Sequence, residues 1–157
     1  MNIFFDTNIV LEFLADRPNA KQVEAAIKLC EDNGWTKSLS IGSIYTIAYM
    51  TERILHRKGI NKPELTKEQR MIYNSLLESF EIVSLAPSGV AEGANDPSFS
   101  DLEDSFQYQS ALQAHCDILL TLNIKDFKDA DQSDIKITAP PSFLNEFQVA
   151  EKEEKEE

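Results

Sequence analysis

Short apolar runs alternate with longer stretches of helical periodicity along this chain. A short apolar run bounded by turn formers indicates a strand, and apolar residues three and four positions apart indicate a helix. We expect strands at 2–6, 35–40, 80–85, 118–121 and 135–138. We expect helices at 9–15, 20–32, 42–59, 66–79, 87–93 and 101–115, and a last helix after Pro140 and Pro141.

This alternation predicts an α/β fold with a mostly parallel sheet and helices on both faces, because parallel strands are joined by helical crossovers. The fully apolar run at 118–120 is typical of a strand buried between helix layers. A chain of 157 residues suits one domain with one core. We therefore expect a single domain over 1–149, followed by an acidic tail over 150–157 that is disordered or frayed.

The charge balance limits the choice of partners. The formal net charge is −12, and the segment 151–157 contributes five glutamates and two lysines to it. The acidic remainder argues against broad, non-specific binding to nucleic acid, since a polyanion is repelled by a negative surface. It is compatible with a metal site, which needs clustered carboxylates, and with a basic protein partner.

The absence of targeting signals and the cysteine usage bear on the expected compartment. No run of eighteen apolar residues and no basic-then-apolar start is present, so we expect neither a membrane span nor a signal peptide. Cys30 and Cys116 lie far apart, each in an apolar helical pattern, which indicates core packing rather than metal binding. A reducing, cytoplasmic setting fits best.

Asp6 is the first candidate for chemistry. It ends the apolar run at 3–5 and directly precedes a helical pattern, which places a carboxylate at the carboxyl end of the first strand, where open α/β sheets bind ligands. Burying a carboxylate is costly unless it is paired or holds a cation. We therefore expect a ligand or metal site, with the alternative that Asp6 only caps the following helix.

Two further acidic segments are expected at the same sheet edge. One is Asp101-x-x-Asp104, at the start of a helix, and the other is Asn123-x-x-Asp126, just beyond the strand at 118–121. Oxygen ligands without histidine or thiolate favour Mg²⁺ or Mn²⁺ over zinc, and the matching chemistry is phosphodiester hydrolysis. The structural alternatives are that Asp101 starts the helix, within a capping box from Ser100, and that Asp126 is a turn residue.

The three segments together resemble the PIN domain. The motifs run over residues 5–8, 101–112 and 120–127, and their order and spacing match the family over residues 1 to about 140. Within this family the chain resembles the VapC-like toxins of type II toxin–antitoxin pairs, which are small Mg²⁺-dependent ribonucleases. The resemblance implies a three-layer α/β/α fold, an acidic metal site, RNA as substrate, an antitoxin protein as partner and frequently a homodimer.

Two of the family's acids have direct counterparts. By resemblance, the first family acid is Asp6 and the third is Asp104, so these two are the expected metal ligands. Thr7 and Asn8 fall on the polar pair that supports the first acid in the family.

At the other two acidic positions the chain departs from the family pattern. The second family acid is a glutamate early in the helix after the second strand, and Thr46 stands there. The fourth family acid aligns with Asn123. Asp101 and Asp126 are the candidate stand-ins, binding the ion through water or orienting the nucleophile, while Asn123 offers a neutral oxygen.

These observations leave three hypotheses. The first is a metal-dependent ribonuclease, with RNA contacts from the basic side chains of Arg53, His56, Arg57 and Lys58. The second is a degenerate, non-catalytic PIN-like module that acts by binding protein or RNA, because an expected glutamate is missing and the net charge is −12. The third, a phosphatase of the haloacid dehalogenase type, needs a second aspartate two residues after the first, and Asn8 occupies that position.

Overall fold

Five parallel strands form the central sheet of the computed structural model, which describes residues 1–154 and the side-chain surroundings of residues 1–147. The strands are β1 (Asn2–Phe5), β2 (Thr36–Ser40), β3 (Glu81–Val83), β4 (Ile118–Leu120) and β5 (Lys136–Thr138). Their order across the sheet is β3-β2-β1-β4-β5, and all four neighbouring pairs are parallel. All five predicted strands form, each within two residues of its expected ends.

The predicted helices form as well. They are α1 (Thr7–Leu14), α2 (Ala20–Asp32), α3 (Ile41–Arg57), α4 (Glu64–Ser79), α5 (Pro87–Asn95), α6 (Leu102–Gln113) and α7 (Pro140–Glu154). A short 3₁₀ helix, η1 (Ile124–Phe127), was not predicted. Helix α1 begins two residues earlier than expected, directly after Asp6, and α4 also begins two residues earlier, which buries Leu65 completely.

The C-terminal end of α7 overlaps the segment expected to be a frayed tail. Residues 150–154 continue the helix, and residues 155–157 lie outside the described part of the chain. The division into a domain over 1–149 and an acidic tail therefore stays a prediction.

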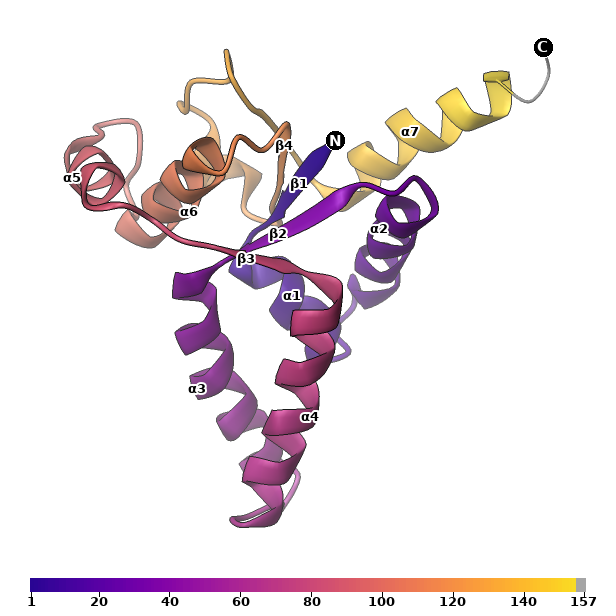
Figure 1. Cartoon of the computed structure of the whole chain (residues 1–157), viewed down its shortest axis with the longest axis vertical. Coiled ribbons are helices and arrows are strands. Elements are labelled where there is room, and N and C mark those ends of the chain that lie inside the picture. The colour runs from indigo at the N-terminus through magenta and orange to yellow at the C-terminus, as the bar shows by residue number, and fades with distance from the viewer. Residues whose placement is uncertain (155–157) are drawn as a thin grey trace.

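Side chains from alternate positions of the strands fill two separate cores, because successive side chains of a strand point to opposite faces. In β1, Ile3 and Phe5 pack with apolar residues of α1, α2, α3, α4 and α7, whereas Phe4 packs with residues of α6 and η1. Figure 1 shows α5 and α6 beside each other and apart from the group formed by α1 to α4. The sheet thus carries helices on both faces, and the predicted three-layer α/β/α fold is confirmed.

Both cysteines belong to these cores. Cys30 packs in the first and Cys116 in the second, and both are buried free thiols. Burial raises the pKa of Cys30 to about 12 and that of Cys116 to about 11, so both remain protonated at neutral pH. The prediction that they serve packing is confirmed. Among the described helices, none is both long enough and apolar enough to cross a bilayer.

The strand order creates a topological switch point at the junction of β1 and β4. The chain builds β2 and β3 on one side of β1, and then returns to build β4 and β5 on the other side. A crevice forms at such a reversal, outside the carboxyl ends of the strands, because successive connections leave in opposite directions. The residues that follow these ends are Asp6 after β1, the start of α3 after β2, and Thr121 after β4.

The close packing of α5 on α6 positions the start of α6 over this edge. Gly93 of α5 lies so near α6 that an added Cβ would stand 2.9 Å from Phe106 Cδ1. Ser105 Oγ donates a 2.8 Å hydrogen bond to the carbonyl of Gly93. The residue before Ser105 is Asp104, so this contact helps to hold a candidate metal ligand in place.

Candidate functional site

Asp6 lies at the N-cap position of α1 and is only 1% exposed. Its side chain makes no capping hydrogen bond to that helix, so the capping alternative is wrong. Asp6 Oδ2 instead accepts hydrogen bonds from Thr121 Oγ1 at 2.7 Å and from Asn8 Nδ2 at 2.9 Å. The carboxylate is therefore oriented by the segment after β4 and by its own helix.

The charge state of Asp6 is strongly affected by its surroundings. Burial raises the pKa of Asp6 to about 7, because the ionised carboxylate loses its hydration. The hydrogen bond from Thr121 lowers this pKa, whereas the negative charges of Glu103 and Asp104 raise it further. A divalent cation beside Asp6 favours the ionised form, since an opposite charge offsets both burial and repulsion.

Asp104 is the second buried acid of the site. It lies in the first turn of α6 and is 5% exposed. Burial raises the pKa of Asp104 to about 6, and the negative charges of Asp101, Glu103 and Asp126 raise it as well. The pKa of Asp104 is thus affected by an acid of the segment after β4 as well as by acids of its own helix start, and the pKa of Asp6 is affected by acids of α6.

Asp101 starts α6. Its Oδ1 accepts a 2.8 Å hydrogen bond from the amide of Glu103, so Asp101 is the N-cap of the helix. The capping box expected from Ser100 and Glu103 does not form, because the cap lies one residue later than the pattern indicated. Asp101 is exposed, and its charge still acts on Asp104.

Asn123 and Asp126 lie on the surface beside the site. Asn123 precedes η1 and Asp126 lies within it, and both side chains are exposed. The amide of Asn123 donates a 3.0 Å hydrogen bond to Thr121 Oγ1, and the amide of Asp126 donates a 2.9 Å bond to the carbonyl of Asn123. The turn of η1 is therefore joined to Asp6 through the hydroxyl of Thr121.

Thr7 and Asn8 have different roles. Asn8 supports Asp6 directly and also accepts a 3.2 Å hydrogen bond from the amide of Leu122. The hydroxyl of Thr7 contacts Ser43 Oγ at 2.7 Å and donates to Glu103 Oε1 at 3.2 Å. The side chain of Thr7 therefore connects β1 to α3 and α6, and supports Asp6 through the chain rather than through its hydroxyl.

Thr46, at the position where the resemblance implies a glutamate, is exposed on the second turn of α3. It lines a pocket of about 210 Å³ between α3, α5 and α6. The polar residues that share this pocket are Ser40, Glu103, Gln107 and Ser110. The threonine thus opens onto the same space as the first turns of α6.

Sequence reasoning did not identify four polar residues that hold the site together. They are Ser43, Glu103, Gln107 and Thr121. Thr121 could have been found, because it is the polar residue directly after a fully apolar strand. Glu103 was interpreted only as an acid at a helix start, and Ser43 and Gln107 carry no charge or motif that would distinguish them.

The donor set fits a partly hydrated Mg²⁺ or Mn²⁺. Within residues 1–147, no three Asp, Glu, His or Cys side chains stand close enough to enclose an ion by themselves. Mg²⁺ typically takes only one or two carboxylates and keeps several waters. Asp6 and Asp104 are two buried acids, and a cation would offset the burial and the neighbouring negative charges that raise their pKa values. Zinc fits poorly, because no imidazole or thiolate takes part.

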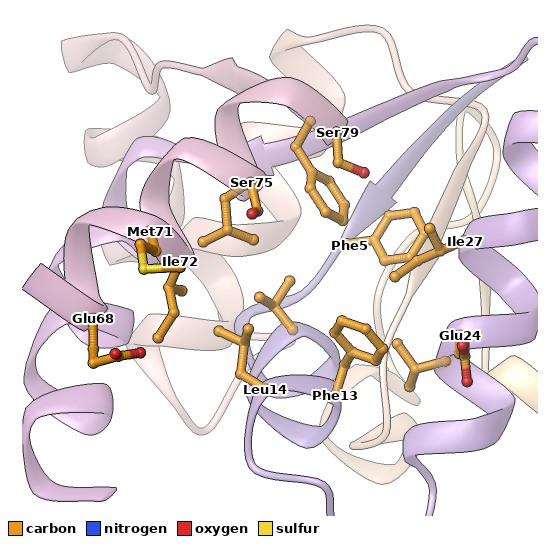
Figure 2. Close-up of a pocket in the computed structure, with 14 residues that line it drawn as sticks. Phe5, Phe13, Leu14, Glu24, Ile27, Glu68, Met71, Ile72, Ser75 and Ser79 are labelled. Atoms are coloured by element: carbon orange, nitrogen blue, oxygen red, sulfur yellow. The ribbon is translucent and has the colours of Figure 1, made fainter. Parts of the chain in front are cut away.

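A larger apolar pocket of about 490 Å³ lies between α1, α2 and α4. Figure 2 shows Phe13 and Leu14 of α1 between Met71 and Ile72 on one side and Glu24 and Ile27 on the other. None of the acidic site residues lines it. This pocket is therefore separate from the candidate metal site.

The fold and the site define a doubly wound α/β protein with two buried aspartates beside its topological switch point. The sequence profile of the PIN domain matches residues 2–125, and the chain belongs to the PIN domain family. No curated protein sequence matches the chain.

Two solved structures of toxin–antitoxin complexes have a similar fold. One is the VapBC2 complex from Rickettsia felis bound to a DNA fragment from its promoter, with a TM-score of 0.64 and 18% identity, covering 88% of this chain and 98% of that chain. The other is a toxin–antitoxin complex from Klebsiella pneumoniae, with a TM-score of 0.59 and 20% identity, covering 88% of this chain and 97% of that chain. At these identities the likeness is one of fold.

Proposed function

We propose that this chain is a Mg²⁺- or Mn²⁺-dependent ribonuclease that hydrolyses RNA phosphodiester bonds with water as the nucleophile. The observation that carries the proposal is the burial of Asp6 in the electrostatic field of Asp104 and Glu103, at the ligand-binding edge of a PIN domain. Two buried carboxyl groups with raised pKa values, surrounded by further acids, are the kind of group that gathers at functional sites. A divalent cation would favour the ionised form of both carboxyl groups.

In this proposal each site residue has a stated role. Asp6 and Asp104 hold the ion, which when bound neutralises charge on the scissile phosphate and makes water a better nucleophile. Asp101 and Asp126 orient the attacking water and accept its proton. Asn123 offers a neutral oxygen to the site, and Thr121 and Asn8 keep the carboxylate of Asp6 in one orientation.

In this proposal, basic residues at the far end of α3 contact the RNA away from the reaction. Arg53, His56, Arg57 and Lys58 are exposed at the C-terminal end of α3, whose N-terminal end lies at the site. Ten residues of helix, from Ser43 to Arg53, span roughly 15 Å. An RNA that reaches both ends of α3 therefore has to extend over several nucleotides. We accordingly propose a longer, structured RNA as the substrate rather than a short oligonucleotide.

The experiment that tests the proposal is RNA cleavage in the presence of Mn²⁺, for the wild-type chain and for Asp6→Asn and Asp104→Asn. We expect each variant to lose activity by at least about 100-fold. Mutating a residue that only supports a metal ligand already lowers metal affinity or activity by about 10- to 100-fold, and a ligand itself should matter more. The control is Asp32→Asn, which removes an exposed carboxylate paired with Lys28 on α2. Equal cleavage by all four proteins would mean that the activity comes from elsewhere.

The alternative is a non-catalytic PIN-like module that acts by binding protein or RNA. The observation that favours it is the neutral Thr46 at the position of an expected acid, together with the lack of a three-acid group within residues 1–147. Titration with Mn²⁺ by calorimetry separates the two. The absence of binding heat at millimolar Mn²⁺ would favour the non-catalytic module.

We also propose that the chain is the toxin of a type II toxin–antitoxin pair and that it forms a homodimer. Support comes from the two structural neighbours, which are both toxin–antitoxin complexes. Expression of the chain alone in bacteria should slow growth, and expression of Asp6→Asn at the same level should not. Light scattering on the purified chain measures its oligomeric state, and a monomer at micromolar concentration would contradict the homodimer.

A further inference from the structure

We propose that the exposed face of α3 is an RNA-binding surface on which unpaired bases stack. The rings of Tyr45 and Tyr49 form its stacking positions, and Arg53 follows Tyr49 one turn later. We call these three residues the α3 stripe. The proposal rests on the proposed ribonuclease function, and it adds which surface holds the RNA and that the segment held there is single-stranded.

The two tyrosines are strongly exposed for aromatic residues. Tyr45 is 76% exposed and Tyr49 is 59% exposed, and Tyr45 is the most exposed of the large apolar side chains within residues 1–147. The two residues are four positions apart on one helix, so they lie on the same face. Four residues of helix rise about 6 Å, so the two rings can each receive a different base of one strand.

Arg53 holds Tyr49 in place. Its Nη1 donates a 3.0 Å hydrogen bond to Tyr49 Oη, and its guanidinium carbon lies 5.5 Å from the centre of the Tyr49 ring. Two side chains that are already ordered lose less conformational entropy when a ligand binds. A guanidinium beside an aromatic ring also offers RNA two contacts, a flat surface for a base and a charge for a phosphate.

The charge at the C-terminal end of α3 suits a polyanion. Residues 53–62 contain two arginines, two lysines and a histidine but no acid, although the formal net charge of the chain is −12. The nearest acid in the sequence, Glu52, reaches His56 at 3.7 Å and Lys62 at 3.8 Å. Cationic side chains attract the phosphates of RNA, so this end of α3 can bind RNA where the rest of an acidic surface repels it.

The α3 stripe also leads to the candidate site. Thr46 lines the pocket beside that site together with Glu103 and Gln107. Tyr49 and Arg53 follow Thr46 by three and seven positions, so they share its face of the helix. Figure 1 shows α3 running from the sheet to the far end of the molecule. One strand of RNA can therefore lie along α3 with one end at the site and the other among the cations.

A second copy of the chain fits this face less well than RNA does. A specific dimer buries about 800 Å² on each partner. The large apolar side chains exposed on α3 are Ile41, Tyr45 and Tyr49, at 41%, 76% and 59%. Since a large side chain buries about 150–250 Å² when fully covered, these three offer roughly 350 Å². A narrow stripe of rings that ends among cations suits a single strand better.

The stacking positions select unpaired bases. In an RNA duplex the faces of each base are covered by its neighbours, whereas the bases of loops and bulges can be splayed out onto aromatic side chains. Such stacking tolerates different sequences, because every base has a flat face. We therefore expect α3 to hold a single-stranded segment of the longer RNA, such as a loop.

Fluorescence anisotropy in the presence of a chelator tests the proposal, because it measures binding without metal and without cleavage. The probes are an unstructured RNA single strand of about 12 nucleotides and a duplex of the same length. Tyr45→Ala and Tyr49→Ala should each weaken single-strand binding by about 5- to 150-fold, the value of one base–aromatic stack, and should change duplex binding little. Tyr45→Phe keeps the ring and should bind within about threefold of the wild-type chain.

The salt dependence separates the stacking residues from the cation. Arg53→Gln should reduce the slope of log affinity against log salt by about 0.7, because one phosphate contact to a single strand is lost. Tyr45→Ala should leave that slope unchanged. The matched controls are Leu77→Ala on α4, an apolar side chain that is 60% exposed, and Lys21→Gln on α2, an exposed cation. Both should bind RNA as the wild-type chain does, and thermal melting checks that all variants fold.

Several outcomes would overturn the proposal. They are equal single-strand binding by Tyr45→Ala, Tyr49→Ala and the wild-type chain, or no binding of either RNA by the wild-type chain. Light scattering adds a third: if Tyr45→Ala dissociates a dimer, with or without loss of RNA binding, the stripe is an interface between copies. Cleavage that depends on Asp6 while the tyrosine variants bind normally would leave the proposed function standing without this surface. Stripe-dependent binding without any cleavage would support the surface and refute the ribonuclease.

Discussion

The hydroxyl of Thr121 donates a 2.7 Å hydrogen bond to the carboxylate of Asp6, although the two residues are 115 positions apart in the sequence. The bond crosses the junction between β1 and β4, where the order in which the chain adds strands reverses. Thr121 Oγ1 also accepts hydrogen bonds from the amide of Asn123 and from Asn8 Nδ2. One buried hydroxyl thus connects the central carboxylate to both neighbouring segments.

Thr121→Val should destabilise the chain, because valine keeps the shape but removes the donor to a buried carboxylate. We expect a loss of about 1–3 kcal/mol in the free energy of unfolding. The bond lowers the pKa of Asp6, so its removal raises that pKa further, and the loss should be larger at pH 8 than at pH 5. Urea denaturation at the two pH values measures it. The control Thr66→Val on α4 should change little, and an equal loss at both pH values would contradict the role of the bond.

Asp6→Asn should stabilise the metal-free chain at high pH. The pKa of Asp6 is raised from 3.8 to about 7, so between these values the unfolded chain releases the proton first and stability falls as pH rises. The difference of about 3 pKa units corresponds to at most about 4 kcal/mol, and asparagine avoids this cost because it cannot ionise. Urea denaturation in the presence of a chelator should show that Asp6→Asn is more stable than the wild-type chain at pH 8 and nearly equal to it at pH 4. A variant that is less stable at pH 8 would contradict this assignment.

Mn²⁺ should raise the melting temperature of the wild-type chain in a pH-dependent way. Binding to the folded state stabilises it by about 2.7 kcal/mol when the ion is at 100 times its dissociation constant. Protons compete for the same oxygens, so the effect should be full at pH 8 and small at pH 5, below the raised pKa values of Asp6 and Asp104. Differential scanning fluorimetry with and without chelator measures it. Asp104→Asn is the matched control and should show a much smaller shift at pH 8.

Two helical glycines should respond to alanine with opposite signs. At Gly93, an added Cβ would stand 2.9 Å from Phe106 Cδ1 and 3.2 Å from Ser105 Oγ, so Gly93→Ala should cost about 1–3 kcal/mol as α5 moves away from α6. At Gly42, the nearest atom would be Ser40 Oγ at 3.4 Å, which is an ordinary contact. Gly42→Ala should therefore be neutral or stabilise the chain by up to about 1 kcal/mol. Urea denaturation compares the two variants. A stabilising effect of Gly93→Ala would mean that α5 and α6 can accommodate the added methyl group without losing their packing.

Much of the fold could be predicted from local pattern. Apolar runs and helical spacing predicted all five strands and all seven helices of the described chain, because each element buries a face whose period is visible in the sequence. The short turn of η1 was missed, since four residues are too few to show a period. The helix cap at Asp101 was misplaced by one residue, because Ser100 and Asp101 are both good N-cap residues and local sequence does not choose between them.

The sequence by itself determined the class of fold and the acids that could bind a metal. The spacing of apolar residues and the positions of the charged side chains can both be read directly from it. The tertiary structure alone decided how those positions meet. It brought Thr121 to Asp6, and it turned Glu103 toward Thr7. These contacts join segments about a hundred residues apart, and their geometry depends on strand order and helix packing. No local pattern encodes that geometry, because it arises only when the whole sheet has formed.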